Sequence, residues 1–362
     1  MKTKGVILFV GLGELFSGKR ACDTRLYSIN QIFKKNNWDV VVLNRDNINY
    51  KQKNIDEKIK KINVKLFPLN FLIELKYIFV YRKKTRFFSL YSGHCIDILY
   101  YYLLCKIFNK KLIYHYVEYR SSFDRQSIYH KINGWLFDNF FFMLADGFIT
   151  ISKLIDDKII KLGKPTIKIP PLFSKNNLSE LNKNSDNYFA YCGSIDYVSE
   201  IRMLILAFLK LDNEFDFILV IGGDPQKIKI FKNEFLKNKK IKIFSKISNE
   251  DLSLIYSNAK ALLLPLKDTI QNNYRFPQKI SEYASHSGYI ITNKVGDIPD
   301  FFDENINIIY CEYSIKGFSK ALKYALIDEH YNSIKKGSYN VFEKNFNPFV
   351  YTKKIELFLN KI

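Results

Sequence analysis

The feature that most constrains this chain is the alternation of short apolar runs with longer helical patterns. Residues 5–10 (GVILFV) carry no charge and lead into a glycine-containing loop at 11–18. A helical pattern follows over about 20–36, and a second apolar run occupies 38–43. Continuous apolar runs are typical of strands buried in a parallel sheet, which helices connect. The sequence therefore predicts β-α-β units and an α/β fold.

The same alternation begins again in the second half of the chain. Residues 174–187 are polar and poor in apolar anchors, and new apolar runs follow at 188–192 and 217–221. A chain of 362 residues suits two domains of common size. We predict an N-terminal domain over 1–173, a linker over 174–187 and a C-terminal domain over 188–345.

A short helix with an anion-binding character is predicted after residue 276. Pro277 suits a first helical position, and Gly288 is a suitable stop. Lys279 and Glu282 share one face of this helix, while Arg275 lies in the loop that enters it. Helix N-termini favour anions, so the segment could hold a phosphate. The alternative is an ordinary surface helix that carries a Lys/Glu pair.

This segment resembles the nucleotide-sugar site of GT-B glycosyltransferases of the family 4 type. Phe276, Pro277, Lys279, Glu282 and Tyr283 match a common variant of the family pattern, F-P-x-K-x-x-E-Y. The resemblance implies that Glu282 bonds the ribose hydroxyls of the donor. The first acid of the family's E-x7-E pattern, which touches the sugar, is replaced by Tyr274.

The strand ends of the second half also resemble this family. Gly193 and Ser194 end one apolar run, and Gly222 and Gly223 end the next. The resemblance places the donor diphosphate near them, but Ser194 and Ser199 stand where the family has an arginine and a lysine. We expect Arg202, together with Arg275 and Lys279, to supply the missing positive charge.

Candidate catalytic residues lie at the end of an apolar run at 111–117. Family 4 enzymes often have a histidine, or a histidine and an acid, at this point, and the resemblance offers His115 and Glu118. The alternatives are a buried histidine and a loop acid without a special role. Gly11 and Gly13 follow the first strand, where they form a tight turn or, as the resemblance implies, line the interdomain cleft.

The chain is strongly basic, with a formal net charge of +20. This charge favours an anionic partner such as a nucleotide diphosphate or a membrane surface. Basic residues at 58–61 and 82–86 flank an aromatic stretch that includes Phe71, Tyr77 and Phe79. The stretch is either a basic face over an aromatic core or a membrane-docking segment. We expect no nucleic-acid partner.

Other sequence features favour the cytoplasm. The five cysteines include no C-x-x-C pair, which argues against a disulfide framework and against a structural zinc site. No stretch of about 18 residues is apolar enough to span a bilayer. We expect a cytoplasmic protein, peripheral on the inner face of the plasma membrane if it docks there.

The resemblance as a whole implies the GT-B fold, in which two doubly wound Rossmann-like domains face a cleft. It also implies that residues 346–362 form a helix that packs back on the first domain. The expected activity is transfer of a sugar from a nucleotide-diphospho-sugar to a sugar or lipid-linked acceptor, with retention of configuration and with neither metal nor cofactor. Two alternatives stay open: a catalytically degenerate, membrane-docked partner subunit and a GT-B nucleotide-sugar epimerase.

Overall fold

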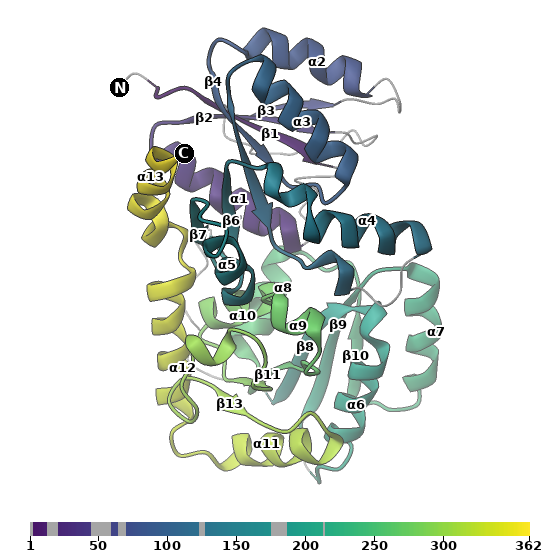
Figure 1. The fold of residues 1–362 in the computed structure, drawn as a ribbon. Helices are drawn as coiled ribbons and strands as arrows, with labels where there is room; N and C mark the ends of the chain where they lie inside the picture. Colours follow the sequence, from purple (N-terminus) through teal and green to yellow (C-terminus); the bar gives the residue numbers. More distant parts are fainter. Residues whose placement is uncertain are drawn as a thin grey trace. The chain divides into compact units, whose positions relative to one another are not determined.

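The structure, a computed structural model, describes residues 3–12, 21–44, 59–63, 70–122, 127–174, 187–212 and 214–362 (Figure 1). It divides into two compact units. The first comprises residues 1–174, 273–276 and 348–362, and the second comprises residues 175–272 and 277–347. The predicted linker at 174–187 lies almost wholly outside the described residues.

The first unit contains a parallel sheet, whose described strands follow the order β3-β2-β1-β4-β5-β6-β7. The order reverses between β1 and β4, as in doubly wound folds. The strands are β1 (Val6–Leu12), β2 (Asp39–Asn44), β3 (Ile59–Asn63), β4 (Thr85–Leu90), β5 (Lys111–Tyr116), β6 (Gly147–Thr150) and β7 (Thr166–Lys168).

Helices of the first unit connect these strands. They are α1 (Ala21–Lys35), α2 (Asn70–Tyr81), α3 (Cys95–Ile107), α4 (Ile128–Asn139) and α5 (Lys153–Ile160), with 3-10 turns η1 (Arg120–Ser122) and η2 (Phe141–Leu144). The sequence predicted one helix over 133–145. The structure instead ends α4 at Asn139, because Phe140 leaves helical geometry and a 3-10 turn follows.

The C-terminal segment, residues 348–362, groups with the first unit. It forms the 3-10 turn η6 (Pro348–Tyr351) and α13 (Thr352–Lys361). Ile355, Phe358 and Leu359 are buried in the same apolar cluster as Ile7 and Phe9 of β1. A Cβ atom on Gly147 of β6 would lie 2.4 Å from Cδ1 of Ile362, so the glycine permits this close packing.

The second unit contains a parallel sheet in the order β10-β9-β8-β11-β12-β13, again with a reversal, here between β8 and β11. The strands are β8 (Tyr188–Ser194), β9 (Asp216–Gly222), β10 (Ile241–Phe244), β11 (Ala261–Leu264), β12 (Ile290–Thr292) and β13 (Ile309–Tyr310). Ligands of such sheets bind outside the carboxyl ends of the strands, at the reversal.

Some helices of the second unit start at residues whose side chains cap them. Asp224 accepts hydrogen bonds from the backbone N–H groups of Gln226 and Lys227, with Pro225 opening the helix, and Ser248 caps α8 through Asp251 N–H. The helices are α6 (Val198–Phe208), α7 (Pro225–Phe235), α8 (Asn249–Asn258), α10 (Gln278–Ser285), α11 (Ile315–Ile327) and α12 (Tyr331–Val341), with 3-10 turns η3 (Ile195–Tyr197) and η4 (Ile298–Asp300) and a π-helical turn, η5 (Phe342–Phe346). Helix α9 (Ile270–Tyr274) begins in the second unit and ends in the first.

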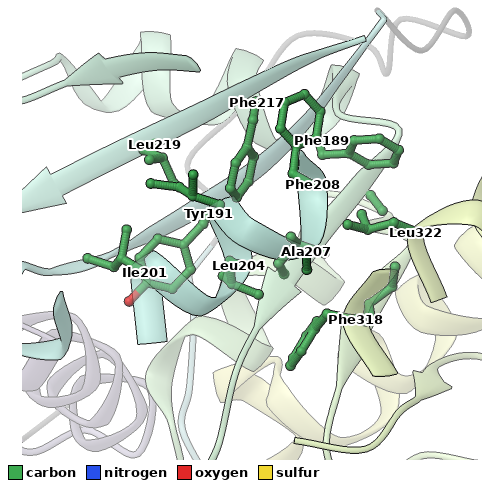
Figure 2. Close-up of a cluster of buried hydrophobic side chains, with 14 of the residues drawn as sticks. Phe189, Tyr191, Ile201, Leu204, Ala207, Phe208, Phe217, Leu219, Phe318 and Leu322 are labelled. Carbon is green, nitrogen blue, oxygen red and sulfur yellow. The ribbon is translucent and has the colours of Figure 1, made fainter. Parts of the chain in front are cut away.

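The core of the second unit is rich in aromatic side chains. Phe189, Phe208 and Phe217 lie close together, and helix α11 adds Phe318 and Leu322 (Figure 2). The rings of Phe208 and Phe217 are 5.3 Å apart, which is within the range of favourable aromatic pairs. This cluster fixes the strands whose carboxyl ends carry the candidate site.

Membrane-spanning helices are not found in the described part of the chain, where no helix is both long enough and apolar enough to cross a bilayer.

The two α/β units, each with a parallel sheet and surrounding helices, confirm the predicted fold class.

Candidate functional site

Helix α10 begins one residue later than the sequence predicted. Pro277 is its extended N-cap residue, and the first helical residue is Gln278. The helix ends at Ser285, before the stop predicted at Gly288, and Ser287 takes a left-handed conformation with φ of 53°. Gly288 is needed for another reason: a Cβ there would lie 2.8 Å from the Tyr283 carbonyl oxygen.

Lys279 and Glu282 form an ion pair on α10. Lys279 Nζ lies 2.6 Å from Glu282 Oε2, and the Glu282 side chain is only 9% exposed. Tyr256 of α8 joins them, because its hydroxyl accepts a hydrogen bond of 3.1 Å from Lys279 and donates one of 3.4 Å to Glu282. The site thus holds a carboxylate, an ammonium and a phenol together.

The charge state of Lys279 is set by opposing effects. Burial favours the neutral amine, but Cys192 and Glu282 beside it raise the pKa of Lys279 above its usual value. Burial, reinforced by Cys192 and Glu282, raises the pKa of Tyr256. The site therefore presents a protonated lysine and a neutral phenol at neutral pH.

Helix α10 is also fixed to the strand that carries Gly193. The Tyr283 hydroxyl accepts a hydrogen bond of 3.0 Å from the backbone N–H of Cys192. His286, at the end of the helix, is buried and hydrogen-bonded through Nε2 to the Ser253 hydroxyl at 2.8 Å. These contacts bring together two segments that the sequence predicted to share a site.

The carboxyl ends of β8 and β9 lie side by side, because Ser194 pairs with Gly222 in the parallel register. Gly223 has φ of 118°, which disfavours any other residue, and a Cβ there would contact Ile195. A Cβ on Gly193 would overlap the Tyr191 hydroxyl. The glycines therefore let the backbone turn closely at this edge.

The serines at the expected cation positions are engaged locally. The Ser194 hydroxyl accepts from Asp196 N–H and donates to the Asp196 carboxylate, while Ser199 donates to Glu200. Arg202 forms two hydrogen bonds, of 2.8 and 2.9 Å, to the Glu234 carboxylate. Arg202 thus has an exposed anionic partner within its own unit, and its contact with a diphosphate stays a prediction.

Tyr274 and the two residues after it belong to the first unit rather than to the unit that holds α10. Its ring stacks on Tyr119 with centroids 4.5 Å apart, and its carbonyl oxygen accepts a hydrogen bond of 2.7 Å from Ser152. Burial, and then Tyr119, raises the pKa of Tyr274. Phe276 is buried, whereas Arg275 is half-buried.

His115 and Glu118 differ in their surroundings. His115 is fully buried between the rings of Phe9 and Tyr91, and its Nε2 lies 2.7 Å from the Ser89 hydroxyl. Glu118 is half-buried beyond the end of β5. Burial, helped by Arg25, lowers the pKa of His115 to about 3. His115 is therefore neutral and buried at neutral pH, and its catalytic role, like that of Glu118, stays a prediction.

The low pKa of His115 predicts a pH-dependent stability. Because the unfolded histidine has its ordinary pKa of 6.5, it binds a proton between about 6.5 and about 3 that the folded protein does not bind. The free energy of unfolding should therefore decrease as the pH falls through this window, by up to about 1.4 kcal/mol per pH unit. Urea denaturation at several pH values measures this slope.

The matched variants make that measurement specific. His115→Gln keeps a hydrogen-bonding side chain near Ser89 but does not titrate, so its stability should depend less on pH. His330→Gln removes an exposed histidine and should leave the slope unchanged. Equal slopes in all three proteins would contradict the assignment of a low pKa to His115.

The glycine loop after β1 is described only in part. Gly11 has φ of 71°, and a Cβ there would lie 2.4 Å from Leu90 Cδ1, so a glycine is required on both counts. Gly13 lies outside the described residues. Among the described residues, no group of three or more histidine, cysteine, aspartate or glutamate side chains is arranged to hold a metal ion.

Sequence reasoning missed Tyr256, Cys192 and Tyr119. No motif marks them, since each meets its partner only through the fold. The one usable signal is Tyr283, the residue after Glu282 in the quoted pattern, whose hydroxyl links α10 to Cys192.

Comparison with known proteins gives a family-model match for the second half of the chain. Residues 174–341 match the family model described as glycosyl transferases group 1. A search of curated proteins finds no significant match. The fold is similar along almost its whole length to several solved structures, of which three are described next.

Sucrose-phosphate synthase from Thermosynechococcus elongatus has a TM-score of 0.78 and 14% identity, with 99% of this chain and 98% of that chain covered. HepE from Anabaena in complex with UDP-glucose has a TM-score of 0.72 and 13% identity, covering 99% and 100%. The lipopolysaccharide outer core galactosyltransferase WaaB has a TM-score of 0.62 and 16% identity, covering 98% and 99%. The chain therefore has the GT-B fold, and its residues 174–341 match the glycosyl transferases group 1 model.

Proposed function

We propose that this protein is a glycosyltransferase that takes a sugar from a nucleotide-diphospho-sugar held by its second unit. The observation that carries the proposal is the Lys279–Glu282 pair on α10, inside the region that matches the glycosyl transferases group 1 model. HepE, which shares the fold, was solved with UDP-glucose. This supports a nucleotide-sugar donor, and UDP-sugars are the first donors to test.

Each part of the site has a role in the proposal. Glu282 accepts hydrogen bonds from the ribose hydroxyls, and Lys279 places a positive charge near the diphosphate. The glycine turns after β8 and β9 let the phosphates approach the backbone at the sheet edge. With lysine and helix dipoles stabilising the departing diphosphate, transfer proceeds without a metal ion and, as in family 4, with retention of configuration.

The acceptor in this proposal is a sugar or a lipid-linked saccharide of cell-surface polysaccharide assembly. WaaB, which has the same fold, acts on the lipopolysaccharide outer core, and this supports such an acceptor class. The first unit binds the acceptor, and the reaction takes place in the cytoplasm at the inner face of the plasma membrane.

Thermal unfolding with a panel of UDP-, GDP-, ADP- and CMP-sugars tests the donor site. A ligand that binds only the folded protein stabilises it by about 2.7 kcal/mol at a hundred times its Kd. One nucleotide class should raise the melting temperature of the wild-type protein and give sugar transfer when an acceptor is supplied. Glu282→Ala should lose the shift.

A second glutamate provides the control. Glu304 pairs with Lys294 at 2.7 Å, but both side chains are well exposed, so Glu304→Ala should keep the full shift. No shift with any nucleotide would refute the donor site. A shift that depends on Glu282, without transfer to any acceptor, would favour the degenerate partner subunit over an enzyme.

A further inference from the structure

Helix α3 is apolar on both faces. One face, with Ile98, Tyr101 and Leu104, is buried against the first unit. The other face presents an apolar stripe whose members are between 41% and 72% exposed: Ile96, Leu99, Leu103 and Ile107. Their spacing of three and four residues aligns them along one side of the helix. At 13 residues the helix is about 20 Å long, too short to span a bilayer.

The two neighbouring helices add to this stripe. In Figure 1, α3 lies between α2 and α4. The Tyr100 hydroxyl donates to the Phe71 carbonyl of α2 at 2.9 Å, and Asn133 of α4 bonds to the backbone of Gly93 and Cys95 before and at the start of α3. More than half of each further side chain is exposed: Leu72, Phe79 and Val80 on α2, and Ile128, Ile132 and Trp135 on α4.

In the stretch that carries α2 and α3, residues 70–110, the surface charges are positive. In residues 70–110, the two acids are buried. Glu74 accepts a hydrogen bond from the Tyr101 hydroxyl, and Asp97 accepts one from the Ser92 hydroxyl. The cations of the same stretch are half-buried or exposed: Lys76, Arg82, Lys83, Lys84, Arg86, Lys106 and Lys110. Lys76 lies between Leu72 and Phe79/Val80 on α2, and the Arg82 guanidinium lies 3.4 Å from the centre of the Phe79 ring.

We propose that these stripes and cations form an apolar–basic face that docks on an anionic lipid membrane. The apolar side chains would enter the boundary between headgroups and acyl chains, with α3 parallel to the surface, while the lysines and arginines meet lipid phosphates. Trp135 and Tyr100 are of the residue types enriched at this depth.

The sign of the charge selects this partner over a second copy of the chain. In a two-fold symmetric dimer the same face meets itself, so the cations of residues 76–110 would oppose one another. A membrane with anionic headgroups offers the complementary charge instead. The inference deepens the proposed function, because it names the surface that would hold the protein at the membrane, and it does not depend on the donor site.

Vesicle co-sedimentation of the full chain tests the face. The wild-type protein should bind phosphatidylglycerol-rich vesicles at least about ten times more tightly than pure phosphatidylcholine vesicles, and added salt should weaken the binding. Leu103→Glu/Ile107→Glu should reduce affinity for the anionic vesicles by about 100-fold, because both stripe positions become charged and repel the lipid. Lys76→Glu/Lys106→Glu should abolish the preference for anionic lipid.

A matched double variant keeps the test specific. Leu236→Glu/Ile327→Glu makes the same two exchanges at exposed apolar sites of the second unit and should bind vesicles like the wild type. Circular dichroism melting curves check that every variant is folded, and nucleotide-sugar thermal shifts report on the donor site separately.

Three results would overturn the inference. They are no binding of the wild type to anionic vesicles, an equal loss of binding in Leu103→Glu/Ile107→Glu and Leu236→Glu/Ile327→Glu, and a dimer in solution that Leu103→Glu/Ile107→Glu dissociates.

Discussion

The Phe217→Ala variant is expected to lose about 3–5 kcal/mol of the free energy of unfolding of the second unit. Phe217 is fully buried on β9, where its ring meets Phe208 (Figure 2). Strand β9 is hydrogen-bonded to β8 on one side and to β10 on the other, so the backbone cannot close over the vacated space. The cavity would therefore remain.

Urea denaturation followed by tyrosine fluorescence or circular dichroism measures this loss. The control is Phe244→Ala at the end of β10 in the same unit, where the ring is partly exposed and less is lost. Its midpoint should stay much closer to that of the wild type. Similar midpoints for the two variants would contradict the expectation that Phe217 contributes much more to stability than Phe244.

The Lys279→Met variant is expected to lose both stability and transfer activity. Removing the ammonium leaves the Glu282 carboxylate nearly buried, and among the described residues its remaining side-chain hydrogen-bond partner is the Tyr256 hydroxyl at 3.4 Å. Breaking a buried pair from one side costs about 3 kcal/mol or more, and this pair, with Lys279 a quarter exposed, should lie near the lower end. If Lys279 also faces the diphosphate, kcat/KM should fall by about 100-fold.

A double variant separates the two effects. Lys279→Met/Glu282→Gln removes the unpaired charge, so much of the stability should return, whereas transfer should stay lost. Lys294→Met breaks the exposed pair with Glu304 and should change stability by less than about 1 kcal/mol. If Lys279→Met keeps full transfer activity, the Lys279–Glu282 pair has a structural role only, and the proposed contact with the diphosphate is wrong.

The strands and the α10 helix could be predicted from the sequence because their signals are local. Apolar runs such as residues 5–10 and 217–221 became strands of parallel sheets, and the 274–288 pattern gave a helix that begins within one residue of the expected start. The ends of helices were less predictable. Gly288 was expected to stop α10, but Ser287 adopts the left-handed conformation at the helix end, and Gly288 permits close packing.

The site was harder to predict because its contacts join distant residues. His115 lies on β5, a strand buried on both faces, so alternation of residue types could not tell whether its side chain faces the core or a ligand. The stacking of Tyr119 on Tyr274 joins residues far apart in the sequence and has no local signature. The roles of Glu282, Lys279, Arg275 and the strand-end glycines in donor binding stay predictions.

The position of α13 has a consequence for synthesis on the ribosome. Its side chains Ile355, Phe358 and Leu359 complete the apolar cluster around β1, at the opposite end of the chain. The first unit therefore cannot close its core when residues 1–174 emerge, and must wait until the whole second unit has been translated. During that interval the nascent first unit exposes the surface that α13 later covers, which makes it a natural client for chaperones that bind apolar surface.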